Sequence, residues 1–143
     1  MHRKAMGNLI EWKNNPSRKP LILRGARQVG KTWLVEEFGE REFKNTLVVN
    51  LESRTMHEAF QDVTDPEKIL KILSIKSGRD ADGSTLLFLD EIQECPDALA
   101  SLKYFAEKMP GAYVIAAGSL LGVSTGQRRT FPVGKVEMLT LLP

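Results

Sequence analysis

Hydrophobic runs and helical spacings alternate along this chain. Short apolar runs predict buried strands at residues 21–23, 46–51, 86–89 and 113–117, with a fifth within 134–142. Between them, apolar residues at helical spacing predict helices near the amino terminus, over 33–38, from Pro66 and from Pro96. Strands that alternate with helices form parallel sheets covered on both faces, so the pattern predicts an α/β fold.

Punctuating residues support these boundaries. Asp65 is a predicted helix cap, and Pro66 suits the first helical position because the missing N–H is not needed there. The polar, glycine-containing residues 77–84 predict an exposed loop, and residues 110–111, Pro-Gly, end the helix that begins at Pro96. These signals precede the predicted strands at 86–89 and 113–117.

A glycine-containing turn joins the first strand to the next helix. Residues 25–32 read Gly-Ala-Arg-Gln-Val-Gly-Lys-Thr, a G-x-x-x-x-G-K-T pattern between an apolar run and a helix start. This arrangement directs successive backbone N–H groups at an anion, with Lys31 reaching phosphate oxygens and the Thr32 hydroxyl reaching magnesium. The predicted nucleotide-binding residues are Gly25, Ala26, Arg27, Gln28, Val29, Gly30, Lys31, Thr32 and Trp33.

An acidic pair follows the third apolar run. We expect Asp90 to join Thr32 in holding magnesium, and Glu91 to orient and deprotonate an attacking water. Ser119, after the fourth run, is the candidate sensor of the terminal phosphate, so the predicted catalytic residues are Lys31, Glu91 and Ser119. The alternative is that the acidic pair and Ser119 only cap turns.

Composition limits the kinds of protein and the compartments that this chain suits. The chain has 143 residues, 42% of them hydrophobic, and a net charge of +2, which suits one domain and gives no indication of nucleic-acid or membrane binding. A single cysteine, Cys95, excludes an internal disulfide and favours the cytoplasm, and no secretory signal or membrane span is evident. His2 and His57 lack the spacing of a zinc site. We interpret Trp12 and Trp33 as packing residues, with Trp33 facing a base or the first helix.

Together these segments resemble the ATPase domain of the AAA-plus superfamily, most closely a prokaryotic family of uncharacterised ATP-binding proteins. The resemblance is carried by residues 21–32, 49–52, 88–96 and 117–122. It implies a P-loop three-layer α/β/α sandwich with five parallel strands in the order 5-1-4-3-2, and binding of ATP with Mg²⁺. On this basis residues 1–17 form an N-terminal helix and 18–143 the ATPase core.

The chain departs from the resemblance near its end. Gly134-Lys135 stands where the family often has Gly-Arg, and lysine lacks the planar fork of arginine. Arg128 and Arg129 are candidates for a finger that reaches a neighbouring subunit, although a solvated loop is the simpler interpretation. Family members continue into a lid and a further domain, so we expect this chain to be part of a longer protein.

The sequence therefore favours an ATPase whose hydrolysis drives conformational change in an attached domain or a partner protein, with self-association as one form of partnership. Two alternatives stay open: a nucleotide switch or assembly module that does not hydrolyse, and a small-molecule kinase on the same core.

Overall fold

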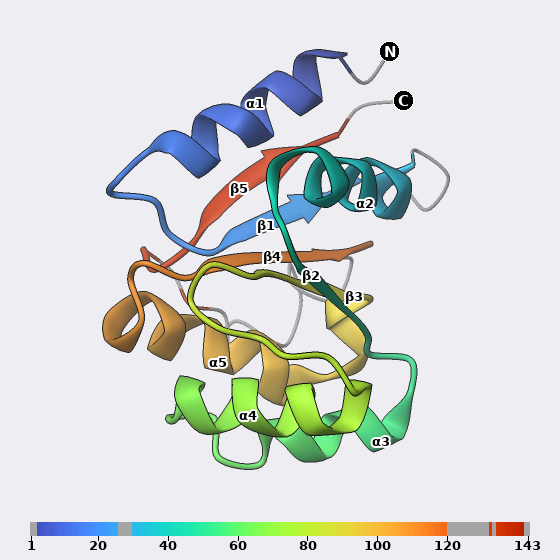
Figure 1. Ribbon diagram of the computed structural model, residues 1–143, viewed down its shortest axis with the longest axis vertical. Coiled ribbons are helices and arrows are strands. Elements are labelled where there is room, and N and C mark those ends of the chain that lie inside the picture. Colours follow the sequence, from blue (N-terminus) through green and yellow to red (C-terminus); the bar gives the residue numbers. More distant parts are fainter. Residues whose placement is uncertain (1–2, 26–29, 120–131, 133, 142–143) are drawn as a thin grey trace.

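A five-stranded parallel sheet forms the centre of the molecule (Figure 1). The computed structural model describes residues 3–25, 30–119, 132 and 134–141. The strands are β1 (Leu21–Arg24), β2 (Thr46–Asn50), β3 (Leu86–Asp90), β4 (Tyr113–Gly118) and β5 (Glu137–Thr140). Their order is β2-β3-β4-β1-β5, with every pairing parallel, which confirms the predicted order read from the other edge.

Helices cover both faces of the sheet. They are α1 (Arg3–Asn14), α2 (Lys31–Glu42), α3 (Arg54–His57), α4 (Pro66–Ser77) and α5 (Pro96–Lys108), with short 3₁₀ turns η1 (Glu58–Phe60) and η2 (Ile92–Glu94). Figure 1 shows α1 and α2 on one side and α3, α4 and α5 on the other. The three-layer α/β/α prediction is confirmed.

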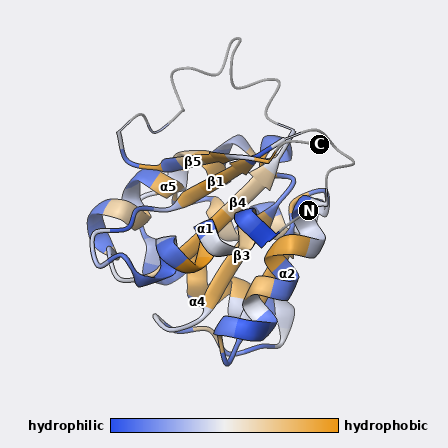
Figure 2. Ribbon diagram, turned by 90° about the horizontal axis from the view of Figure 1, so that it is seen from above, coloured by the Kyte–Doolittle hydropathy of each residue, from blue (hydrophilic) through white to orange (hydrophobic). Residues whose placement is uncertain are grey.

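Alternate residues of each strand enter opposite halves of the core. In β3, Leu87 and Leu89 pack with α4 and α5, whereas Leu86 and Phe88 pack with α1 and α2. This follows from the period of two along a strand. Figure 2 shows the result, with hydrophobic colouring concentrated on the strands and hydrophilic stretches on the outer helices.

The predicted elements all form, with small shifts of boundary. The backbone N–H of Lys68 donates to the Asp65 carboxylate at 3.1 Å, and Pro66 begins α4 as expected. Gly78 ends α4 in the left-handed region at φ 73°, a conformation that glycine adopts without a steric penalty. The sequence interpretation missed α3, η1 and η2, because three or four residues are too few to show a helical period.

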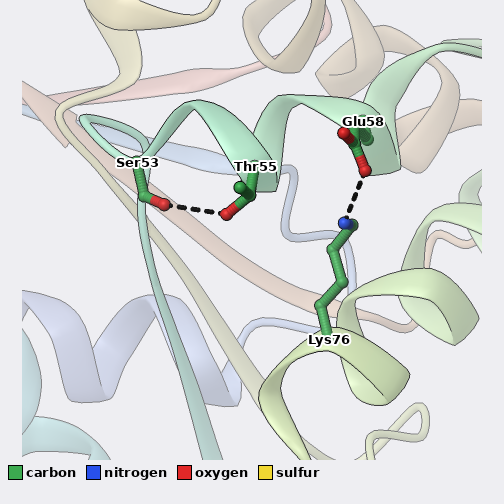
Figure 3. A network of polar contacts seen from close by, with 4 residues as sticks. All are labelled: Ser53, Thr55, Glu58 and Lys76. Atoms are coloured by element: carbon green, nitrogen blue, oxygen red, sulfur yellow. Dashed lines mark hydrogen bonds and ion pairs between the residues drawn. The ribbon is translucent and has the colours of Figure 1, made fainter.

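One ion pair joins the short helices after β2 to α4, and a second polar contact lies within the segment after β2 (Figure 3). Lys76 Nζ donates to Glu58 Oε1 at 2.7 Å, and the Ser53 and Thr55 hydroxyls lie 3.0 Å apart. The hydrogen bond and positive charge of Lys76 lower the pKa of the Glu58 carboxyl. These contacts lie at the surface, since the Glu58 side chain is 62% exposed.

The two tryptophans differ in burial. Trp12 is 5% exposed, its indole N–H donates to the Lys19 carbonyl at 2.7 Å, and it contacts Phe38, as predicted for a packing residue. Trp33 is 53% exposed and so is not a core residue, but it lies beside α1, one of the two neighbours expected for it. Trp33 is not among the buried residues of α2, and it lines a hollow beside α1.

Within the residues that the structure describes, no helix is long and apolar enough to cross a membrane. Cys95 is buried, and burial raises the pKa of its thiol, which suits a packing residue rather than a nucleophile.

Candidate nucleotide site

The carboxyl ends of three adjacent strands bring the predicted site residues together. β4 lies between β1 and β3, with Arg24 paired to Gly118 and Asp90 paired to Ala117. Residues that follow these strand ends therefore share one edge of the sheet. Gly25 after β1, the acidic pair at the end of β3 and Ser119 after β4 lie along this edge.

The described part of the glycine turn leads directly into α2. Gly30 has φ 81°, a left-handed conformation that favours glycine, and α2 begins at Lys31. The Lys31 side chain is only 7% exposed, and its ammonium donates to the Gly25 carbonyl at 2.7 Å. The Lys31 ammonium therefore lies against Gly25, the first residue of the turn. Residues 26–29, Ala26, Arg27, Gln28 and Val29, lie outside the described residues.

Thr32 and Asp90 are in direct contact although 58 positions separate them in the chain. The Thr32 hydroxyl donates to Asp90 Oδ2 at 2.8 Å, and the Glu91 backbone N–H donates to Asp90 Oδ1 at 2.9 Å. Burial raises the pKa of Asp90, while these two hydrogen bonds and, more weakly, the Lys31 charge lower it. Burial disfavours the charged form of Asp90 more than these contacts favour it, so a bound cation would stabilise the carboxylate.

The donor set suits magnesium. The Thr32 hydroxyl and the Asp90 carboxylate are hard oxygen ligands, which Mg²⁺ prefers. Across the described ranges, no group of three or more His, Cys, Asp or Glu side chains could hold a metal ion. A site with one carboxylate and one hydroxyl fits Mg²⁺, which usually keeps several waters and takes further oxygens from phosphates.

Glu91 stands in an unusual backbone conformation at the end of β3. Its φ of 55° and ψ of 51° lie in the left-handed region, and among the described residues it is the only non-glycine with positive φ. This conformation costs on the order of 1–3 kcal/mol and is often retained at functional sites. The Glu91 carboxylate accepts a hydrogen bond from Gln93 Nε2 at 2.7 Å.

The sequence interpretation missed the contact of Gln93 with Glu91. Gln93 is the last residue of the run that begins at Asp90, but nothing in the sequence pattern showed that its side chain turns back to Glu91. Ser119 follows β4, as predicted, and is half-buried. Asn50, at the end of β2, accepts from the Glu52 backbone N–H at 3.0 Å and so supports its own turn.

The late basic residues do not converge on this edge where they are described. Lys135 pairs with Glu107 of α5 at 3.3 Å. It precedes β5, whose first residue, Glu137, hydrogen-bonds to Pro20 before β1. Lys135 therefore lies near the amino-terminal ends of the strands, whereas Lys31 lies beyond their carboxyl ends. Arg128 and Arg129 lie outside the described residues.

Comparison with known proteins agrees with this geometry. A family model described as an AAA domain matches residues 17–143, nearly the whole chain. The chain belongs to the AAA domain family. A search of curated proteins finds no match.

Solved structures share the fold of this AAA domain at low sequence identity. The Walker-type ATPase PABY2304 of Pyrococcus abyssi matches with a TM-score of 0.63 and 16% identity over 100% of this chain and 53% of its own. Drosophila ORC bound to DNA matches at 0.62 and 18% over 99% and 42%. AMPPCP-bound DnaA from Aquifex aeolicus matches at 0.57 and 15% over 98% and 46%. The chain thus spans about half the length of these proteins.

Proposed function

We propose that this AAA domain binds ATP together with Mg²⁺ and hydrolyses it. The observation that carries the proposal is the contact of Thr32 with Asp90, at 2.8 Å, beside the enclosed ammonium of Lys31. One hydroxyl, one carboxylate and one cation, supplied by two distant segments, are the groups that a nucleoside triphosphate and its metal need. A turn with only a structural role would not require all three.

Each residue has a role in this proposal. The amides from Val29 to Thr32 donate to the phosphates, and the Lys31 ammonium binds phosphate oxygens in place of the Gly25 carbonyl. Thr32 and Asp90 hold the magnesium ion, which, when bound, neutralises charge on the phosphate oxygens. Glu91 orients the attacking water and accepts its proton. Ser119 contacts the terminal phosphate or the water.

Hydrolysis in this proposal drives conformational change in an attached domain or a partner protein. The length of the matched structures supports this, because in each of them a fold like this one makes up about half of a longer chain. We place the protein in the cytoplasm, since a single buried cysteine suits a reducing compartment.

Substitution of Glu91 by Gln tests the proposal. The amide keeps the shape of the side chain but cannot accept the water's proton. We expect the ATP dissociation constant, measured by calorimetry, to change less than about twofold, and phosphate release to fall by at least about 10²-fold. Glu94→Gln is the matched control, because Glu94 is an exposed neighbour on η2 and should leave both quantities unchanged.

The same measurements separate the alternatives. ATP binding with equally negligible phosphate release from wild type and Glu91→Gln would favour a switch or assembly module that does not hydrolyse. Transfer of the phosphate to an added small-molecule acceptor would favour a kinase. Absence of any binding heat from ATP at millimolar concentration would overturn the proposal altogether.

A further inference from the structure

Gln93 lies between two parts of the site that the proposed mechanism uses separately. Its Nε2 donates to Glu91 Oε1 at 2.7 Å. On the other side, a Cβ placed on Gly118 would overlap Gln93 Oε1 and would come within 3.2 Å of Ile92 Cγ2. The carboxamide is therefore in contact with the proposed base and with the last residue of β4.

Chemistry determines which way the carboxamide faces. An ionised carboxylate only accepts hydrogen bonds, so the nitrogen of Gln93 must face Glu91 and the oxygen must face Gly118. That oxygen is buried and has no hydrogen-bond partner among the described residues. A buried acceptor without a donor is unfavourable, and native proteins retain few of them. The arrangement therefore calls for an explanation other than folding stability.

The backbone around Gln93 is well anchored. Ile92 is fully buried, and η2 packs against β4. The Glu94 N–H donates to the Glu91 carbonyl at 3.0 Å, and the Cys95 N–H donates to the Ile92 carbonyl at 3.1 Å. The anchored backbone therefore keeps the Gln93 side chain within reach of both Glu91 and Gly118.

We propose that Gln93 is the positioning residue of this site: it holds the Glu91 carboxylate in place by resting against the end of β4 at Gly118. The inference rests on the proposed function, because it assigns a purpose to Glu91. Ser119, the proposed phosphate sensor, directly follows Gly118, so a displacement at the sensor reaches the base through a single side chain. Glycine at position 118 leaves room for this contact, because an added Cβ would displace the carboxamide.

The contact itself is tested without nucleotide. The Nε2 proton signals of Gln93 are assigned in NMR spectra by their disappearance in Gln93→Leu. We expect one proton of the pair to resonate downfield of the signals of Gln61, an exposed glutamine, and to exchange more slowly with solvent. Glu91→Ala should abolish both features. Identical Gln93 signals in wild type and Glu91→Ala would overturn the proposal.

Kinetics test the consequence. Gln93→Leu removes the donor at nearly constant size, and Gln93→Glu keeps the shape but sets a negative charge against Glu91. We expect each to lower kcat by about 10²-fold, the effect of a misplaced catalytic group, with the ATP dissociation constant unchanged within about twofold. Gly118→Ala should act in the same direction, and Gln61→Leu, the matched control, should leave kcat unchanged.

A double-mutant cycle distinguishes positioning from general damage. If Gln93 acts through Glu91, Gln93→Leu will cause no further loss in a Glu91→Gln background. Additive losses, or a raised dissociation constant with unchanged kcat, would overturn the proposal. Should the wild type bind ATP without turnover, the proposed hydrolysis fails, and the nucleotide-free spectra still decide whether Gln93 holds Glu91.

Discussion

Two polar contacts of similar length lie on different parts of the molecule. At the carboxyl ends of the strands, the Thr32 hydroxyl donates to Asp90 at 2.8 Å. Between α4 and η1, Lys76 donates to Glu58 at 2.7 Å (Figure 3). The carboxylates differ in their surroundings, since Asp90 is 9% exposed as a residue and the Glu58 side chain is 62% exposed.

The difference in burial reverses the direction in which the pKa of the carboxyl shifts. For Glu58 the hydrogen bond and charge of Lys76 are the largest influences, and its pKa falls. For Asp90 the loss of solvent is the largest influence, and its pKa rises despite two hydrogen bonds. Water and Lys76 stabilise the first carboxylate, whereas for the second the two hydrogen bonds and the Lys31 charge do not offset the loss of water. A similar contact length therefore has a different meaning in the two places.

Neutralising Asp90 and neutralising Glu58 should differ most in their effects on turnover. In Asp90→Asn we expect magnesium-dependent turnover to fall at least about 10²-fold, because a metal ligand worth several kcal/mol is lost. In magnesium-free buffer the same variant should melt at the wild-type temperature or above, since the buried charge is unfavourable there. Glu58→Gln should leave turnover unchanged and lower the melting temperature slightly. A clear loss of stability in Asp90→Asn would contradict this interpretation.

Removing the hydroxyl of Thr32 and removing that of Thr55 should produce a smaller difference in turnover. Thr32→Val keeps the shape but takes away one proposed magnesium ligand and the donor to Asp90. We expect turnover to fall about tenfold and the magnesium concentration for half-maximal activity to rise, in line with a hydrogen bond to a charged group. Thr55→Val removes an exposed hydroxyl whose hydrogen bond within the described part of the chain is to Ser53 at 3.0 Å, and activity should be unaffected. Equal activity in the two variants would remove Thr32 from the site.

The exposed pair itself should show the smallest effect. The pKa of Glu58 is lowered below its ordinary value of 4.5, so the pair stabilises the fold above that pH and loses its contribution as the pH falls through the lowered pKa. Comparing melting temperatures of wild type and Lys76→Met should therefore show a small difference at neutral pH and low salt. The difference should vanish in acid, and high salt should reduce it because the pair is exposed. A difference that grows in acid would contradict this assignment.

Much of the fold could be predicted because its signals are local. The apolar runs placed the strands, and the cap at Asp65 with Pro66 placed the start of α4. Short-range patterns could not reveal α3 and η1, or the exposure of Trp33, which depends on which face of α2 meets the sheet.

For the candidate site, the sequence by itself determined the chemical groups: a glycine turn with Lys31 and Thr32, an acidic pair and a serine after an apolar run. It could do so because a phosphate-binding turn and a strand end are each encoded within a few neighbouring residues. Only the tertiary structure decided which of these groups touch. Thr32 meets Asp90, and Gln93 meets both Glu91 and Gly118, because β4 is placed between β1 and β3 and aligns their ends. Such contacts depend on strand order and register, which are set by packing across the whole sheet.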